Sequence, residues 1–308
     1  MRAALAFIFG RTWLLYALMA GALFLLLDRE QLADDVLNAS RPSGDYIHAF
    51  SYGLRDYNEG ELRRAMAYYE TLIPGYPWPP LIYANLGFCH FYLHDIPKAV
   101  EAYRKAIDKD AYIYTFYFDL GSIVLFQGDY AAAARFFEKS RGVFPANRSE
   151  FLNVLDISPK HYQQPLLQEG SSLFRRMDYD LHMIYVYLAT CYFHLNENQK
   201  LLALTVEGTR LYPDDPELSY YAGVASDRLG YLKEAVFLLT NAIRIASNYA
   251  QAYESRAQIL RRAGDEMHYQ EDMQSAQEAR KKGVWRRERE LLDLHHWPDA
   301  ILFFQVYR

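Results

Sequence analysis

A period of 34 residues constrains this sequence more than any other feature. Gly53, Gly87 and Gly121 are spaced by that interval, and the same register continues through Leu155, Ala189, Gly223 and Ala257. Small residues recur twelve positions later in the register, at Ala65, Ala99, Ala133 and Ala235. A fixed period of this length is typical of repeat proteins, in which each unit buries its apolar face only against its neighbours.

Aromatic side chains keep the same register and make up 16% of the chain, including 27 tyrosines. One series lies four residues before the periodic position, at Tyr83, Tyr117, Phe151, Tyr185 and Tyr253. Another lies 16 residues after it, at Tyr69, Tyr103 and Phe137. We expect these rings to fill the wedge between one unit and the next, while small residues such as Gly87 and Ala99 face each other and let two helices approach closely.

The pattern resembles the tetratricopeptide repeat (TPR), and the best-matching unit carries Tyr83, Leu86, Gly87, Ala99, Tyr103 and Ala106. The resemblance implies an all-α fold, a right-handed α-solenoid of about seven pairs of helices. It covers residues 46–283, with units that start at residues 46, 80, 114, 148, 182, 216 and 250. Between the two helices of a pair we expect a turn with positive φ, supplied by Gly60, Gly128, Gly230 and Gly264.

The unit 148–181 diverges from the others. Leu155 and Leu167 replace the small residues, and Pro159 and Pro165 fall where a turn and a second helix should begin. We predict a distorted repeat whose first helix stops near Ile157; the alternative is a boundary between two bundles of three units. The second helix of the last unit is polar, as terminal capping units require, and residues 284–308 are expected to form a capping segment.

The N-terminal residues predict a membrane anchor. Residues 12–27 carry no charge, and residues 7–27 are long enough to span a bilayer with Arg11 near one end. Arg2 and Arg11 precede the segment, whereas acidic residues follow it, so the positive-inside rule predicts a cytoplasmic N-terminus. The expected organisation is an anchor at 1–28, a linker at 29–45 and the solenoid on the exocytoplasmic side, periplasmic or lumenal. The alternative is a cleaved signal peptide.

Composition and motifs argue against chemistry on small molecules. The net charge of −5 gives no basic face for nucleic acid. Cys89 and Cys191 lie three units apart, so we expect two buried free thiols. The sequence contains no phosphate-binding loop, nucleophile elbow or paired metal motif, and we therefore expect no enzymatic activity, cofactor, metal or small-molecule substrate. The basic cluster at 280–289 is expected to be a solvated helix end, or else a contact with anionic lipid or an acidic partner.

The resemblance also implies a binding groove, because TPR proteins line their concave face with positions 2, 5, 9, 12 and 13 of the first helix in each unit. These positions are mainly apolar and aromatic in units one to three and in unit five, and become polar in the last two units. The predicted groove consists of Phe50, Leu54, Tyr57, Phe88, Phe91, Tyr92, Phe118, Leu125, Phe126, Phe193 and Tyr220. It would hold an apolar helix or an extended segment of a partner protein. The alternative is that these rings pack on one another.

Together these features predict a membrane-anchored TPR scaffold or structural subunit that binds and organises the proteins of a membrane-associated complex. The alternative is a secreted or periplasmic peptide-binding assembly factor, released by cleavage of a signal peptide.

Overall fold

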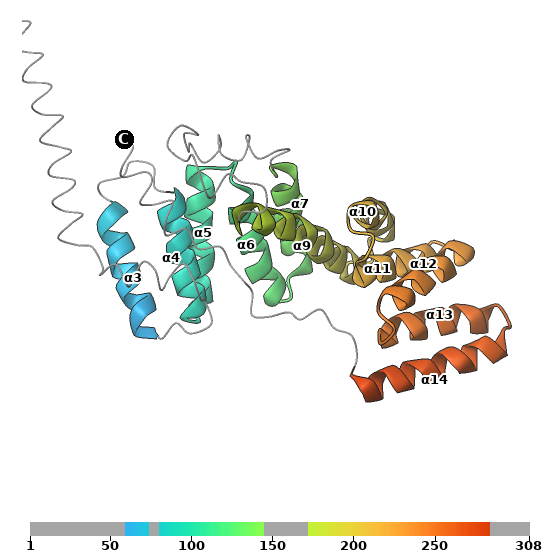
Figure 1. Cartoon of the computed structure of the whole chain (residues 1–308). Helices are drawn as coiled ribbons and strands as arrows, with labels where there is room; N and C mark the ends of the chain where they lie inside the picture. Colours follow the sequence, from blue (N-terminus) through green and yellow to red (C-terminus); the bar gives the residue numbers. More distant parts are fainter. Residues whose placement is uncertain (1–58, 74–79, 145–171, 284–308) are drawn as a thin grey trace, which may run out of the picture. The chain divides into compact units, whose positions relative to one another are not determined.

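The computed structural model describes residues 59–73, 80–144 and 172–283, and within these ranges the chain is helical with short turns. Figure 1 shows the helices in chain order, coloured from blue to red. Their bounds are α3 Glu59–Leu72, α4 Pro80–Tyr92, α5 Ile96–Lys109, α6 Tyr114–Phe126, α7 Tyr130–Gly142, α9 Ser172–His194, α10 Asn198–Leu211, α11 Pro216–Arg228, α12 Leu232–Ile245, α13 Ala250–Arg262 and α14 Glu266–Lys282.

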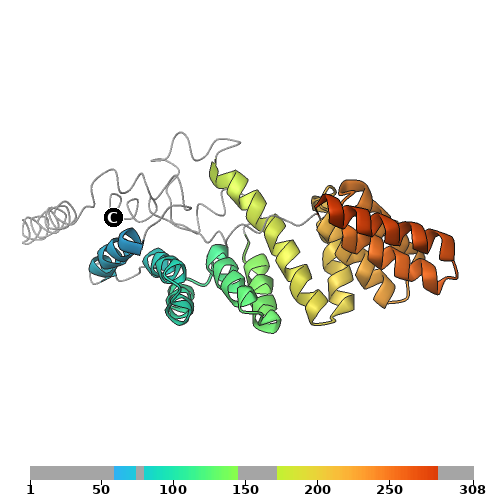
Figure 2. The ribbon, with the colours of Figure 1, turned by 90° about the horizontal axis from the view of Figure 1, so that it is seen from below.

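Consecutive helices pack as antiparallel pairs that stack on one another. The pairs are α4 with α5, α6 with α7, α9 with α10, α11 with α12 and α13 with α14, and each pair contacts the next (Figures 1 and 2). This arrangement confirms the predicted all-α stack of helix pairs, while its right-handed sense stays a prediction. Among the described helices none is long and apolar enough to cross a membrane. The predicted anchor at residues 7–27 lies outside the described residues.

The turns within the pairs follow the 34-residue register. Gly128, Gly230 and Gly264 have φ between 82° and 84°, as the sequence predicted. At the same register position His94 and Asn196 adopt φ of 61° and 57° without being glycine, a conformation that costs a non-glycine residue some strain. The expectation for Gly60 was wrong, because this residue lies in the first turn of α3.

The glycines on the first helices accept an aromatic or aliphatic side chain of the same pair. A Cβ atom at Gly87 would lie 2.6 Å from Cδ2 of Tyr103, a ring that is completely buried. Gly121 meets Phe137 in the same way, at the same spacing of 16 residues. The small residue at position 87 therefore makes room for a ring of its own unit.

Helix α9 changes the arrangement expected around the fourth unit. It runs from Ser172 to His194 without a break at residue 182, where the fifth unit was predicted to start. The sequence has neither proline nor glycine between these ends, so nothing in it stops the helix. α7 packs directly against α9 (Figure 2). α9 carries the residues that were predicted to form the first helix of the fifth unit, so in the stack the third unit is followed by α9. Residues 145–171, including Pro159 and Pro165, lie outside the described residues.

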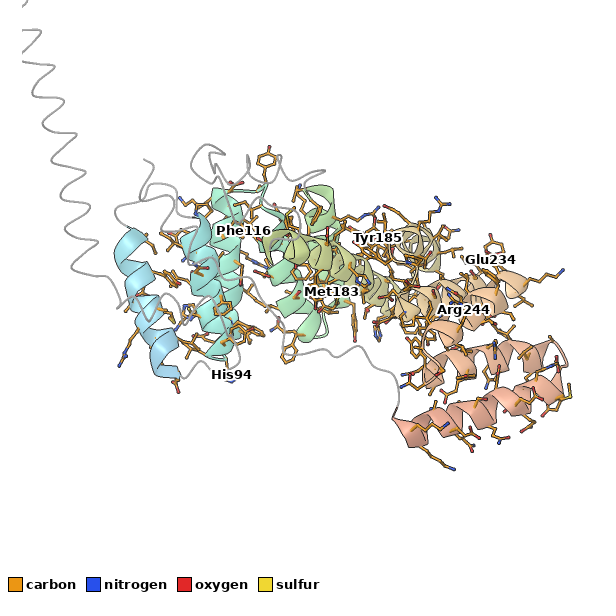
Figure 3. The ribbon with its side chains drawn as sticks, viewed as in Figure 1. His94, Phe116, Met183, Tyr185, Glu234 and Arg244 are labelled. Atoms are coloured by element: carbon orange, nitrogen blue, oxygen red, sulfur yellow. The ribbon has the colours of Figure 1, made fainter. Side chains whose placement is uncertain are left out.

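Specific contacts, some of them buried, join α6 and α7 to α9. The Tyr114 hydroxyl donates to Oδ2 of Asp180 over 2.8 Å, and the rings of Tyr130 and His194 stack with centroids 4.0 Å apart. Phe116 and Met183, both labelled in Figure 3, are also buried. Buried contacts therefore join the described helices on either side of the divergent unit, which argues against a boundary between two separate bundles.

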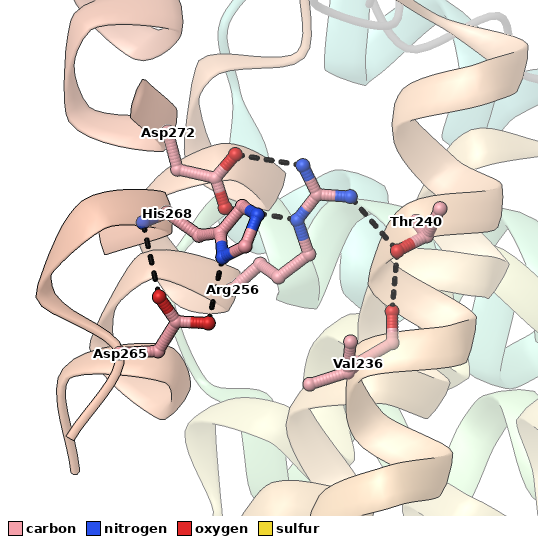
Figure 4. A network of polar contacts seen from close by, with 6 residues as sticks. All are labelled: Val236, Thr240, Arg256, Asp265, His268 and Asp272. Atoms are coloured by element: carbon pink, nitrogen blue, oxygen red, sulfur yellow. Dashed lines mark hydrogen bonds and ion pairs between the residues drawn. The ribbon is translucent and has the colours of Figure 1, made fainter. Parts of the chain in front are cut away.

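The last pair is held to its neighbour by a polar network (Figure 4). Arg256 of α13 donates from Nε and Nη2 to the two carboxylate oxygens of Asp272 on α14, at 2.9 and 2.7 Å. Its Nη1 donates to the hydroxyl of Thr240 on α12 over 2.8 Å, and that hydroxyl donates to the Val236 carbonyl. The carboxylate of Asp272 raises the pKa of Arg256. One side chain thus links three helices, and both groups of the ion pair are satisfied.

Candidate protein-binding surface

The structure separates the predicted groove residues into two sets by their place along the helix. Phe50, Leu54 and Tyr57 lie outside the described residues. Phe88 and Phe118, in the middle of α4 and α6, are buried, whereas the residues at the C-terminal ends of the first helices reach the surface in part or in full, except for Phe91. The two sets therefore differ in what a partner protein could touch.

Phe88 and Phe118 belong to the buried set. Phe88 has no exposed surface, and its ring lies 4.6 Å from that of Tyr92. Phe118 is 3% exposed and lies 6.0 Å from the rings of both Phe137 and Tyr187. Because α6 also packs against α9, this part of the predicted groove is filled by its own side chains. The alternative that the rings pack on one another holds for these two residues.

Tyr220 is intermediate. It is partly buried, and its ring lies 5.5 Å from Tyr221 and 5.1 Å from Tyr249. Burial is also the main cause that raises its pKa. The ring of Tyr220 therefore contributes mostly to the packing of α11, with a limited area left for contact.

The remaining predicted residues lie at the C-terminal ends of the first helices, in what we term the helix-end row. The row is formed by the last two residues of these five helices: Phe91 and Tyr92 on α4, Leu125 and Phe126 on α6, Phe193 and His194 on α9, Asp227 and Arg228 on α11, and Arg261 and Arg262 on α13. Phe126 is 71% exposed, and the side chains of Tyr92, Leu125 and Phe193 are partly exposed.

One contact recurs along the helix-end row, between the last residue of one helix and the residue 35 positions before it. Phe126 lies edge-on to Phe91, with ring centroids 6.4 Å apart. The guanidinium carbon of Arg228 lies 4.5 Å from the ring centroid of Phe193. Arg262 forms an ion pair with Asp227. The repeat therefore brings equivalent residues of neighbouring units together, and the sequence decides whether the contact is aromatic, cation–π or ionic.

The character of the helix-end row changes along the chain. The row is aromatic and aliphatic on α4 and α6, mixed on α9 and charged on α11 and α13. The predicted set included its aromatic members but not Asp227, Arg228 and Arg262. The signal for the two arginines was present, since Arg228 and Arg262 occupy the same position of consecutive units.

Both cysteines lie buried among the described helices. Cys89 and Cys191 are free and buried, as predicted, and burial raises the pKa of both thiols, which keeps them protonated and unreactive. In these parts of the chain no group of three or more histidine, cysteine or acidic side chains is placed to hold a metal ion. What the surface does offer is a row of aromatic and charged side chains, which suits contact with another polypeptide.

The described helices are similar in fold to helical repeats in several solved structures. YrrB, described as a TPR protein with an unusual peptide-binding site, is 15% identical, with a TM-score of 0.53 over 69% of this chain and 92% of its own. A structure of MamA is 18% identical, with a TM-score of 0.49 over 66% and 92%. MamA of Desulfovibrio magneticus is 13% identical, with a TM-score of 0.48 over 66% and 96%. No family model and no curated protein matches the sequence.

Of these three likenesses, the one to YrrB has a TM-score above 0.5, and at 15% identity it concerns the fold alone. Together with the stacked antiparallel pairs and the 34-residue register, it shows that the described helices have a TPR-like fold.

Proposed function

We propose that this protein is a non-enzymatic TPR scaffold that binds a partner polypeptide along the helix-end row. The observation that carries the proposal is the position of Phe126, which is 71% exposed at the end of α6. Phe91, its neighbour in the row, is largely buried, and the rings of Phe91 and Phe126 make an edge-to-face contact. An exposed aromatic side chain supported by a buried one is typical of the anchor positions that dominate protein interfaces.

The aromatic end of the row suits an apolar partner segment. Leu125 is partly exposed beside Phe126, and Tyr92 lies 5.3 Å from Phe91. A partner side chain that covers Phe126 would remove apolar surface from water, at about 25 cal/mol for each Å² buried. An apolar helix or extended segment of another protein, as the sequence predicted, is the occupant that this end of the row favours.

The binding test compares two phenylalanines of equal exposure. Phe126→Ser removes the ring from the row, whereas Phe237→Ser removes a ring that is 69% exposed on the second helix α12. Both changes affect surface side chains, so neither should unfold the protein. The full-length chain, extracted from its own cells with mild detergent, should lose its co-purifying partner with Phe126→Ser and keep it with Phe237→Ser. Equal retention by both variants would contradict the assignment of the row.

The second part of the proposal concerns the membrane. We infer from the uncharged residues 12–27 and the preceding arginines that the chain is anchored by residues 7–27. The scaffold would then act on the exocytoplasmic side, within a membrane-associated complex. The alternative is release after cleavage of a signal peptide. The intact mass of the mature protein separates the two, because a chain that begins after residue 30 has no anchor.

A further inference from the structure

Arg228 and Arg262 are equivalent residues of consecutive units that have different neighbours. Each is the last residue of its helix and reaches back to the residue 35 positions earlier. For Arg262 that residue is Asp227, and the two form an ion pair. For Arg228 the equivalent residue is Phe193, which offers a ring and a backbone carbonyl but no carboxylate. The repeat therefore provides an internal comparison of the same arginine with and without an acidic partner.

The guanidinium of Arg228 is held in place by neutral groups. Its Nη1 donates over 3.3 Å to the Phe193 carbonyl and, at the same distance, to the side-chain oxygens of Asn196 and Asn198. The Phe193 ring supports one face of the group. Nη2 and Nε have no hydrogen-bond acceptor among the described residues, and no described carboxylate pairs with the group. Arg228 itself is exposed.

This arrangement leaves Arg228 preorganised for a carboxylate. An arginine presents a planar fork that matches the two oxygens of a carboxylate, and hydrogen bonds between charged groups are stronger than those between neutral ones. Three acceptors and one ring already restrict the side chain, so less conformational entropy is lost when a partner binds. No described carboxylate forms an ion pair with Arg228, in contrast to Arg262, whose charge is already balanced by Asp227.

We infer that Arg228 binds an acidic side chain, Asp or Glu, of the partner polypeptide, at the charged end of the helix-end row. This inference rests on the proposed function and adds the chemistry of one contact to it. The partner segment would place an apolar side chain near Phe126 and Phe91 and a carboxylate near Arg228. The partner's carboxylate would lie beside Phe193 and contact Arg228, in the same way as Asp227 contacts Arg262.

The test uses an array of 12-residue peptides with apolar residues around one central position, which is Asp, Glu, Asn or Gln. The array is probed with the full-length chain in mild detergent. Peptides with a central Asp or Glu should bind more tightly than their amide counterparts. Arg228→Gln should reduce that preference by about tenfold or more, the amount that a hydrogen bond between charged groups contributes. Arg244→Gln, which changes an exposed arginine of α12 outside the row, serves as the control and should leave the preference intact.

A second pair of variants supplies the missing carboxylate within the chain. Phe193→Asp gives Arg228 the neighbour that Arg262 has, and should abolish the preference for acidic peptides. Phe193→Asn also removes the ring but adds no charge, and should weaken the preference clearly less than Phe193→Asp does. Circular dichroism checks that both variants keep their helices.

The outcomes separate this inference from the proposed function. Peptide binding without a preference for acidic residues, or a preference that survives Arg228→Gln, would overturn the role of Arg228 and leave the scaffold function standing. No binding to any peptide of the array would contradict both.

Discussion

The Tyr114 hydroxyl donates a 2.8 Å hydrogen bond to Asp180 across a buried interface, where it joins the first residue of α6 to α9. The carboxylate of Asp180 is completely buried. A second buried contact follows nearby, since the Ser140 hydroxyl of α7 donates to the Tyr114 carbonyl over 2.9 Å. Tyr114 is thus a fixed point for the stacking of the third unit on α9.

Removal of this hydroxyl should weaken the junction. Tyr114→Phe deletes the donor and leaves a buried carboxylate with one partner fewer, so we expect a loss of about 1.5–3 kcal/mol in the free energy of unfolding. Tyr112→Phe is the matched control, because Tyr112 lies two residues away and is 72% exposed; its effect should be close to zero. Urea denaturation followed by circular dichroism measures both, and equal midpoints would contradict the role of the hydrogen bond.

The close packing at Gly87 predicts that even one methyl group is harmful there. Gly87→Ala places a Cβ atom 2.6 Å from the Tyr103 ring, and overpacking of this kind costs about 1–3 kcal/mol, more than the gain in helix propensity. Gly142→Ala is the comparison, because a Cβ atom there meets nothing within 4 Å. The first variant should lower the thermal midpoint and the second should keep or raise it. A stable Gly87→Ala variant would show that Tyr103 moves aside freely.

The network around Arg256 predicts local rather than global effects. Arg256→Ala leaves Asp272 charged and largely buried, which should destabilise the last helix pair by about 3 kcal/mol. Arg261→Ala removes an exposed cation over the Tyr269 ring and should cost about 0.5 kcal/mol. Hydrogen exchange is the measurement, with faster exchange expected in α13 and α14 for the first variant alone. Unchanged exchange in both helices would contradict the structural role of Arg256.

The cap of α14 predicts a dependence on pH. Asp265 accepts hydrogen bonds from the backbone N–H and the ring of His268, which raises the pKa of His268 above 6.5 and lowers that of Asp265 below 3.8. The histidine's contribution to stability is present below pH 6.5 and is lost as pH rises through its folded pKa. The aspartate's contribution is present above pH 3.8 and is lost as pH falls through its own folded pKa. The cap should therefore be strongest between these two pH values.

Titration of the His268 ring by NMR checks the cause of this shift. Asp265→Asn should bring the pKa of His268 back toward its ordinary value, because it removes the charge that stabilises the imidazolium. Glu278→Gln removes a more distant charge of the same helix and should leave it unchanged. An unaltered pKa in Asp265→Asn would mean that another group causes the shift.

The sequence predicted the fold well because its signals are local. The 34-residue register reflects contacts that each unit repeats, so the register alone was enough to assign Gly128, Gly230 and Gly264 to turns. His94 and Asn196 could have been added by the same register, although neither is glycine. The buried state of Cys89 and Cys191 followed from their position beside the core.

What the sequence predicted less well depends on how units stack. Phe88 and Phe126 were equivalent candidates in the repeat pattern, yet one is buried and the other exposed. Phe88 lies inside α4 and Phe126 is the last residue of α6, and the repeat period alone does not specify how far neighbouring side chains cover each ring. The continuity of α9 through residue 182 was missed for the same kind of reason, because a helix without breakers ends where its packing ends.

The most direct test of the helix-end row is photocrosslinking at single positions in intact cells. A benzophenone amino acid placed at position 126 should yield one dominant crosslinked protein, because this side chain lies in the proposed interface. The same probe at position 237, which is equally exposed on α12, should yield no such product. A crosslink of equal strength at both positions, or at position 237 alone, would contradict the account.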